Sequence, residues 1–286
     1  MLSYLQAIVL GVLQGVTELF PISSLGHSVI LPGILGWKID QQSPFFLMFL
    51  VATHTATALV LLLFFWKDWV RIVSGIFKTI GSRRIPAGDT HAKLGWLLVV
   101  GTIPAGLVGL LMKHEIRVYL LSGKFAAVFL TLNGVLLLVA ELLRRKASAG
   151  GSENSDARIS KMSWWQAFKV GIMQVLALMP GFSRTASTMA GSLMVGLSHE
   201  DSVRFSFLLS TPIIGAAAAL ELTKLVATGN LKAIGISIVS GLFAALCSYL
   251  SVRFLTAYFK IENRRLTPFA VYCLAAGVFS LIFYFH

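Results

Sequence analysis

Six apolar stretches, each long enough to cross a lipid bilayer, constrain this chain more than any other feature of its sequence. A helix needs roughly 20 apolar residues to span the hydrocarbon core. Only 13% of the 286 residues are charged, against about 25% in a typical soluble domain. The sequence therefore predicts an all-α polytopic membrane protein with six transmembrane helices. The expected spans cover residues 46–66, 94–112, 125–143, 205–223, 233–252 and 267–285.

Two further apolar stretches, about 5–35 and 166–196, are interrupted at their centres by residues that break helices. Pro21 lies in the first interruption, and Pro180 with Gly181 lies in the second. Proline cannot continue the helical hydrogen-bond ladder, and irregular backbone at membrane depth is tolerated only inside protein or around a cavity. We expect each stretch to form a re-entrant helical hairpin whose break lines a polar site.

The two interrupted stretches also resemble each other, which indicates an internal repeat. Each repeat would hold one hairpin and three spans, so the second copy is inverted relative to the first. The first repeat covers 1–146, a polar linker covers 147–160, and the second repeat covers 161–286. The matched positions pair Gln6, Ala7, Gly11, Gln14, Pro21 and Ser24 with Gln166, Ala167, Gly171, Gln174, Pro180 and Ser183.

Basic residues are distributed unevenly between the connecting segments. The formal net charge is +12, and fifteen Lys or Arg residues lie in the segments 67–93, 144–161 and 253–265, whereas the opposite set of loops carries six. Cytoplasmic loops carry such an excess. We therefore expect these segments and the linker to be cytoplasmic and both termini to lie outside. This pattern accounts for the basic charge without nucleic-acid binding.

The first interruption contains a concentration of groups suited to catalysis. Gln14 and Glu18 are four residues apart and share one face of a half-helix. Ionisable groups inside membrane segments are costly and commonly functional. Ser23 and Ser24 offer nucleophilic hydroxyls, and His27 offers a base close by in sequence.

The second interruption contains groups suited to binding phosphate. Arg184 is the only basic residue between Lys169 and Arg204, and its forked guanidinium matches phosphate oxygens. Ser183 and Thr188 could supply further donors near a helix start.

Each of these residues also has a structural interpretation. Glu18 could pair with Arg184 merely to hold the hairpins together, and His27 could be a hydrogen-bonded packing residue. Serines in broken helices commonly bond to backbone. His54 could reach the same cavity, although a single histidine on an apolar helix is more often structural. Asn133 is expected to make a hydrogen bond between helices.

The two interruptions together resemble the undecaprenyl pyrophosphate phosphatase family, also called the bacitracin-resistance family. The resemblance rests on the segments Glu18-Leu-Phe-Pro-Ile-Ser-Ser-Leu-Gly-His27 and Pro180-Gly-Phe-Ser-Arg184 and extends over the whole chain. It implies a bacterial cytoplasmic (inner) membrane protein whose site opens to the outer, periplasmic side. It also implies a divalent cation, magnesium or calcium, as cofactor.

The resemblance further implies particular roles for these residues. Ser24 matches the family's nucleophile, His27 its motif histidine and Arg184 its phosphate-binding arginine, while Gln14 and Glu18 fill its acidic, metal-binding element. Ser23, Ser183 and Thr188 would add phosphate donors. The sequence departs from the family pattern at four places: Gln14 replaces an acid, Leu25 a small hydroxyl residue, and His54 a frequent glutamine. The fourth is the segment Thr185-Ala-Ser-Thr188, which replaces the more typical Ser-Gly-x-Thr.

The expected function is hydrolysis of undecaprenyl diphosphate to the monophosphate, which recycles the carrier lipid for cell-wall synthesis. Ser24 would attack with His27 as base, or water would attack directly. A transporter or flippase of a phosphorylated polyprenyl lipid is the alternative, because inverted repeats with broken helices are typical of transporters. The polyprenyl diphosphate and the bilayer are the expected partners, and the sequence also allows a homodimer.

Overall fold

The computed structural model describes residues 2–41, 43–86, 88–112, 122–143, 154–227, 230–261 and 264–285. Within these ranges the chain is helical and forms no β-strand apart from an isolated bridge between Pro180 and Phe182. Each expected span falls on a long helix or ends within two residues of one. The long helices are α3 (Pro44–Phe64), α5 (Thr90–Leu111), α7 (Gly123–Leu143), α11 (His199–Ala227), α12 (Leu231–Lys260) and α13 (Thr267–Phe285).

Length and hydropathy qualify some of these helices as membrane spans. Within the described residues α5, α7, α12 and α13 are long and apolar enough, and α3 joins α4 (Trp66–Ser82) in a bent pair that would make a fifth span. The sixth expected span, 205–223, lies inside α11, whose first turn already carries Glu200 and Asp201. The chain is therefore a multi-pass, all-helical membrane protein with four to five span candidates by these criteria.

Both expected interruptions are present. In the first, α1 (Tyr4–Thr17) ends before the Pro21 loop and α2 (Ser24–Ile34) follows it. In the second, α9 (Trp164–Gln174) and the 3-10 turn η2 (Val175–Leu178) precede α10 (Arg184–Met194). Helices α1 and α9 begin with the same device, a capping box in which a serine and a glutamine satisfy each other's backbone amides. The pairs are Ser3 with Gln6 and Ser163 with Gln166.

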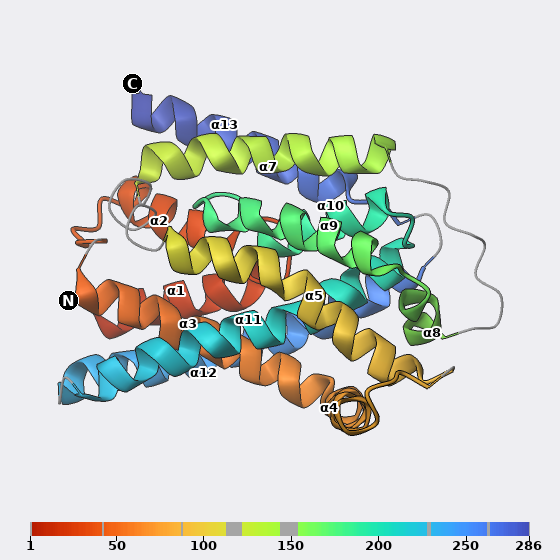
Figure 1. The fold of residues 1–286 in the computed structure, drawn as a ribbon. Helices are drawn as coiled ribbons and strands as arrows, with labels where there is room; N and C mark the ends of the chain where they lie inside the picture. Colours follow the sequence, from red (N-terminus) through yellow and green to blue (C-terminus); the bar gives the residue numbers. More distant parts are fainter. Residues whose placement is uncertain are drawn as a thin grey trace.

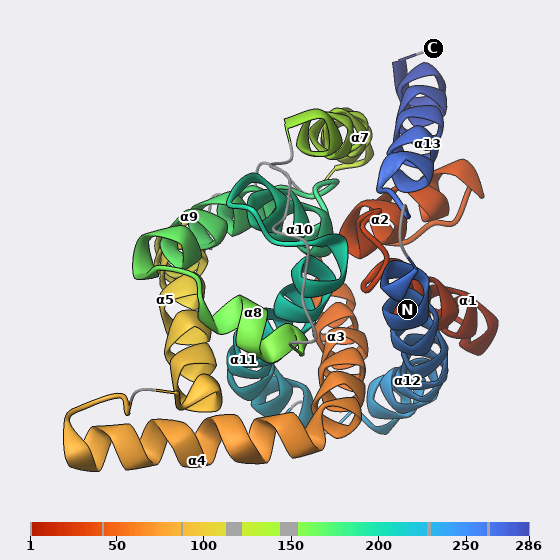
Figure 2. The ribbon, with the colours of Figure 1, turned by 90° about the vertical axis from the view of Figure 1, so that its right-hand side faces the viewer.

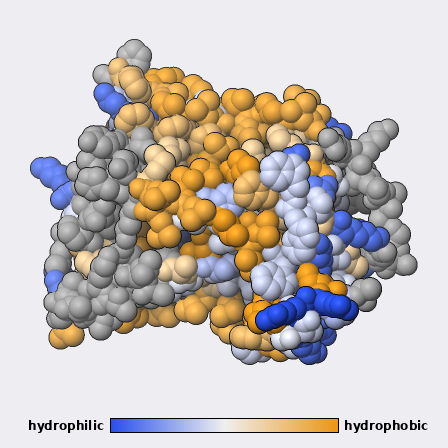
Figure 3. All heavy atoms as spheres, in the orientation of Figure 1, coloured by the Kyte–Doolittle hydropathy of each residue, from blue (hydrophilic) through white to orange (hydrophobic). Residues whose placement is uncertain are grey.

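The long helices run roughly side by side, with the two short helix pairs between them (Figure 1). Helix α1 packs against α12, α9 packs against α5, and α7 lies along α13 in both views (Figures 1 and 2). Two glycines permit these close approaches. A Cβ on Gly11 would meet the backbone of Ser240, and one on Gly171 would meet Gly101. In Figure 3, apolar residues cover the middle of the molecule and hydrophilic ones gather toward its right-hand end.

The expected linker is only partly irregular. Residues 147–153 lie outside the described residues, but Ser155–Ser160 forms the short helix α8. Arg158 holds it against α11 by contacts of 2.7 Å with both Glu200 and Asp201. The hydrogen bond to Asp201 raises the pKa of the Arg158 guanidinium. Composition alone predicts a flexible segment here, because it cannot show ion pairs with residues that are distant in the sequence.

Candidate active site

The two interruptions meet at the centre of the molecule, and α2 and α10 both begin there. Ser23 is the N-cap of α2, where its hydroxyl accepts from the amide of Gly26 at 3.2 Å. Its backbone has φ 70, a left-handed conformation that costs a non-glycine residue free energy. This strained turn makes Ser24 the first residue of α2 and places it next to Glu18, which caps the end of α1.

Asn133 on α7 connects the two loops directly. Its Nδ2 donates to the carbonyl of Pro21 at 3.0 Å, and its Oδ1 accepts from the amide of Ser183 at 2.9 Å. The hydroxyl of Thr185 adds a second link by donating to the Glu18 carbonyl at 3.1 Å. The expected interhelical role of Asn133 is thereby confirmed, since one buried amide side chain fixes both loops.

The Glu18 carboxylate is the centre of the site and is only 6% exposed. Its Oε1 accepts from Arg184 Nη2, and its Oε2 accepts from the hydroxyl of Ser24. Gln14 Nε2 also donates to Oε2, at 3.1 Å, and His54 Nε2 lies 3.2 Å from the same atom. A buried carboxylate requires such compensation, because an unpaired one would be strongly destabilising.

Arg184 has one guanidinium nitrogen, Nη1, that is buried without a hydrogen-bond acceptor among the described residues. Its Nη2 binds Glu18. A buried guanidinium N–H without a partner costs about 1–3 kcal/mol or more, so its retention in the site calls for an anionic ligand. The side chain is 12% exposed and starts at the first residue of α10, where helix amides also favour anions. This combination fits a phosphate group.

The structure separates His27 from Ser24. His27 Nδ1 lies 2.6 Å from the carbonyl of Ser23, which can only accept, so Nδ1 carries the hydrogen. The other nitrogen, Nε2, lies 2.8 Å from the Tyr272 hydroxyl, and the two rings stack at 5.7 Å. Both nitrogens are thus engaged elsewhere, and the atom that accepts the Ser24 hydrogen bond is on Glu18.

Three hydroxyls expected to bind phosphate have partners within the protein. Those of Ser23 and Ser183 cap α2 and α10 by accepting from Gly26 and Ala186. Thr188 donates to the Arg184 carbonyl at 2.8 Å and lies 2.6 Å from the Ser206 hydroxyl. These contacts hold the helix starts in place, and a direct role in phosphate binding stays a prediction for all three.

Sequence reasoning underestimated His54 and did not single out Tyr272. His54 Nδ1 lies 2.7 Å from the Leu50 carbonyl while Nε2 faces Glu18, so both ring nitrogens face acceptors. An imidazolium satisfies that arrangement. Tyr272 comes from α13, far away in the chain. No local motif marks either residue, because their roles depend on how α3 and α13 pack against the first loop.

The groups around Glu18 do not form a metal site by themselves. In the described part of the chain no three His, Cys, Asp or Glu residues cluster in a way that could hold a metal ion. Among the residues that the structure describes, Glu18 is the only carboxylate at the site, and donors occupy both of its oxygens. Gln14 Oε1 is buried without a partner and is one free acceptor. The protein alone therefore does not supply a cation's ligand set in this arrangement.

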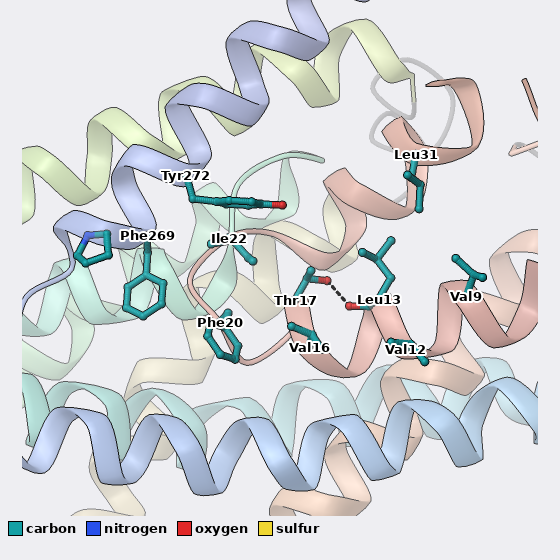
Figure 4. A pocket seen from close by; sticks show the side chains of 11 residues that line it. Val9, Val12, Leu13, Val16, Thr17, Phe20, Ile22, Leu31, Phe269 and Tyr272 are labelled. Carbon is teal, nitrogen blue, oxygen red and sulfur yellow. Dashed lines mark hydrogen bonds between the residues drawn. The ribbon is translucent and has the colours of Figure 1, made fainter. Parts of the chain in front are cut away.

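An apolar groove lies between α1, the Pro21 loop and α13 (Figure 4). It has a volume of about 630 Å³ and is formed by α1, the Pro21 loop, α2 and α13. Tyr272 of α13 and Thr17, the neighbour of Glu18, are its two lining residues with a hydroxyl group. The remaining walls are Val9, Val12, Leu13, Val16, Phe20, Ile22, Leu31, Pro268 and Phe269. The groove is almost entirely apolar and borders the site through Thr17, the neighbour of Glu18, and through Tyr272, the partner of His27.

The fold and the site define a multi-pass membrane protein with a buried centre of serine, carboxylate and arginine. A family model described as "Bacitracin resistance protein BacA" matches residues 7–279. The chain belongs to this family.

Curated relatives cover nearly the whole chain. A protein named "Undecaprenyl-diphosphatase" from Mycolicibacterium paratuberculosis is 46% identical over 98% of this chain and 97% of its own length. "Undecaprenyl-diphosphatase 2" from Chromobacterium violaceum is 44% identical over 98% of both chains. "Undecaprenyl-diphosphatase" from Granulibacter bethesdensis is 42% identical over 97% of this chain and 95% of its own.

Proposed function

We propose that this protein is an undecaprenyl-diphosphate phosphatase that returns the carrier lipid to its monophosphate form. One observation carries the proposal: the Ser24 hydroxyl donates to Glu18 while Arg184, bound to the same carboxylate, keeps one N–H unpaired. A nucleophile, its proton acceptor and an anion-binding group therefore surround one small space. The names of the relatives specify the substrate and disfavour the transporter alternative.

The geometry supports attack by Ser24 on the terminal phosphorus. The Ser24 Oγ–P bond forms, the bond from phosphorus to the bridging oxygen breaks, and undecaprenyl monophosphate leaves. Glu18 accepts the hydroxyl proton, and Arg184 Nη1 donates to the phosphate oxygens. Water then cleaves the phosphoserine, releasing phosphate and restoring the hydroxyl. Phosphoryl transfer depends mainly on such positioning and charge stabilisation. Direct attack by water, with Ser24 as a hydrogen-bonding group, is the second mechanism.

His27 and Tyr272 belong to the side of the site that faces the apolar groove. Because Nε2 of His27 can accept from the Tyr272 hydroxyl, the pair can relay a proton toward a departing phosphate oxygen. The groove beginning at Tyr272 would hold the first isoprene units of the lipid tail. The diphosphate would then lie between Arg184 and Ser24, where the two loops meet.

We further propose that the chain forms six spans and two re-entrant hairpins in an inverted repeat. The matching capping boxes, the matched close contacts of Gly11 and Gly171, and the pairing of α1 with α12 and α9 with α5 support it. The excess of basic residues in the segments 67–93, 144–161 and 253–265 favours a cytoplasmic location for that end. Both termini would lie outside an inner membrane, with the site facing the same side.

A divalent cation, magnesium or calcium, stays part of the proposal. Because the protein offers few free ligands, the diphosphate oxygens would supply most of them, with Gln14 Oε1 as a protein ligand and Glu18 available only if a donor leaves it. Such a cation would neutralise phosphate charge. A homodimer also stays a proposal.

Phosphate release from undecaprenyl diphosphate by the purified protein tests the function, with and without magnesium or calcium. Arg184→Ala should lower turnover at least a hundredfold, since it removes a charge-assisted contact to the reacting group. Arg253→Ala is the control, because Arg253 is exposed on α12. Absence of turnover in the wild type, with lipid binding intact, would instead support a transporter.

A further inference from the structure

Helix α4 (Trp66–Ser82) differs from every long helix in direction. It turns by 82° from the axis of α3 after a break at Phe65. Figure 2 shows it extending across the end of the molecule, at a steep angle to α3 and α5, whereas Figure 1 shows it end-on. A helix that is nearly perpendicular to membrane-spanning helices would run roughly parallel to the membrane plane, so α3 alone would be the span of this bent pair.

Several contacts fix α4 in this direction. Asp68 forms an ion pair of 3.2 Å with Arg204 of α11, and the Arg204 guanidinium also lies over the Phe65 ring. Farther along, Trp96 of α5 donates to the Thr79 hydroxyl at 2.8 Å. Gly75 is so close to α5 that an added Cβ would lie 2.8 Å from the backbone of Ala92. The bend is therefore part of the fold.

The side chains of α4 divide into three faces at 100° per residue. The first, with the buried residues Ile72, Gly75 and Thr79, packs toward α5. The second is apolar but exposed, and Phe77 on it is 70% exposed. This exposed apolar face consists of Trp66, Val70, Val73, Phe77 and Ile80.

The third face is basic and consists of Lys67, Arg71 and Lys78. An apolar stripe beside a basic one is the pattern of helices that lie in the membrane interface and bind anionic lipids. The described residues that pack on α4 cover neither stripe. The charge is complementary to phosphate headgroups, and the apolar stripe to the acyl chains beneath them.

The residues around α4 include several tryptophans. Tryptophans concentrate at membrane–water interfaces. Trp96 contacts α4 directly, and Lys93, one turn earlier on α5, lies 3.3 Å over the Trp164 ring at the start of α9. Five of the six tryptophans belong to these segments at one end of the molecule: Trp66, Trp69, Trp96, Trp164 and Trp165.

We propose that α4 is an interfacial helix that binds anionic phospholipids. Its exposed apolar face enters the acyl region of the bilayer, and Lys67, Arg71 and Lys78 bind lipid phosphates. The proposal is independent of the phosphatase chemistry, because α4 contributes no residue to the site around Glu18. It assigns to this chain a lipid-binding surface separate from the substrate site.

Photo-crosslinking tests the proposal with the full chain in lipid nanodiscs. Phe77 is replaced by benzoylphenylalanine in discs of equal phosphatidylglycerol and phosphatidylcholine, and mass spectrometry identifies the adducts after illumination. We expect phosphatidylglycerol adducts to exceed phosphatidylcholine adducts about fivefold or more, since each nearby basic residue contributes about 1 kcal/mol. Equal adducts would contradict the anionic preference, and adducts to a second protein chain would show that a protein partner covers this face.

Matched variants then test which charges are responsible. The triple variant Lys67→Gln, Arg71→Gln and Lys78→Gln should bring the adduct ratio close to equality. The control variant Lys38→Gln, Lys124→Gln and Lys232→Gln removes the same charge elsewhere and should keep the preference. Wild-type melting temperatures of both variants in detergent show that they are folded. A preference that survives the α4 variant, or is lost equally in the control, would overturn the proposal.

Discussion

His54 Nε2 lies 3.2 Å from Glu18 Oε2, and this contact ties the middle of α3 to the loop that carries the serine. Within the described part of the chain, the carboxylate receives four contacts, from Ser24, Gln14, Arg184 and His54. Each limits the orientations that Glu18 can adopt. The carboxylate therefore presents a fixed oxygen to the Ser24 hydroxyl.

His54→Leu should lower kcat about tenfold or more, because a charge-assisted hydrogen bond of about 1.5–3 kcal/mol to Glu18 is lost. His54→Gln should stay within about fivefold of wild type, since its amide can still donate to the carboxylate. Steady-state phosphate release measures both. An equal loss of kcat in the two variants would mean that activity does not depend on a hydrogen bond from position 54 to Glu18.

The sequence predicted the residues that are unusual for their surroundings. Glu18 and Arg184 could be identified because ionisable groups are rare in apolar segments. The two loops could be identified because Pro21 and Pro180 interrupt apolar segments. The contact between His54 and Glu18 could not be predicted from the sequence, because it depends on the packing of α3 against the end of α1. The bend after Phe65 is also set by tertiary contacts, chiefly those of Arg204.

The neighbouring variants Ser24→Ala and Ser23→Gly should affect different properties: the first should lower activity, and the second should preserve or raise stability. Removing the nucleophile should lower turnover about a thousandfold or more. Ser23→Gly loses a few tenths of a kcal/mol as an N-cap but relieves about 1 kcal/mol of strain at φ 70. Its melting temperature should therefore match or exceed that of the wild type. Full activity of Ser24→Ala would exclude a phosphoserine intermediate and leave direct attack by water.

Asn133→Leu should destabilise the protein, because the Ser183 amide loses its partner and the Pro21 carbonyl keeps the weak Cys273 thiol donor at 3.8 Å. These losses together cost about 2–4 kcal/mol. Thr102→Val is a suitable control, since among the described residues that hydroxyl donates only to the Leu98 carbonyl of its own helix. Thermal unfolding in detergent compares them. Similar melting temperatures for the two variants would show that Asn133 is not what holds the loops together.

Val12→Trp should obstruct the apolar groove and raise KM for undecaprenyl diphosphate about tenfold, which corresponds to about 55 Å² of lost apolar contact. Isopentenyl diphosphate lacks the long tail, so its hydrolysis should be unaffected. Val139→Trp is a matched control, because Val12 and Val139 are both 37% exposed and Val139 lies outside the groove. An unchanged KM for the long substrate in Val12→Trp would place the tail elsewhere.

Gly11→Ala should lower the melting temperature, because the new methyl group would be forced against the Ser240 carbonyl where α1 crosses α12. Overpacking of this kind costs about 1–3 kcal/mol. Gly171→Ala should behave alike, since it meets the Gly101 carbonyl where α9 crosses α5. Gly106→Ala meets no atom within 4 Å and should be neutral or stabilising by up to about 1 kcal/mol. Parallel losses at Gly11 and Gly171, with none at Gly106, would mean that the same crossing contact stabilises both halves of the chain. If Gly171→Ala alone were tolerated, the two crossings would not be energetically equivalent, and the proposed repeat would lose that support.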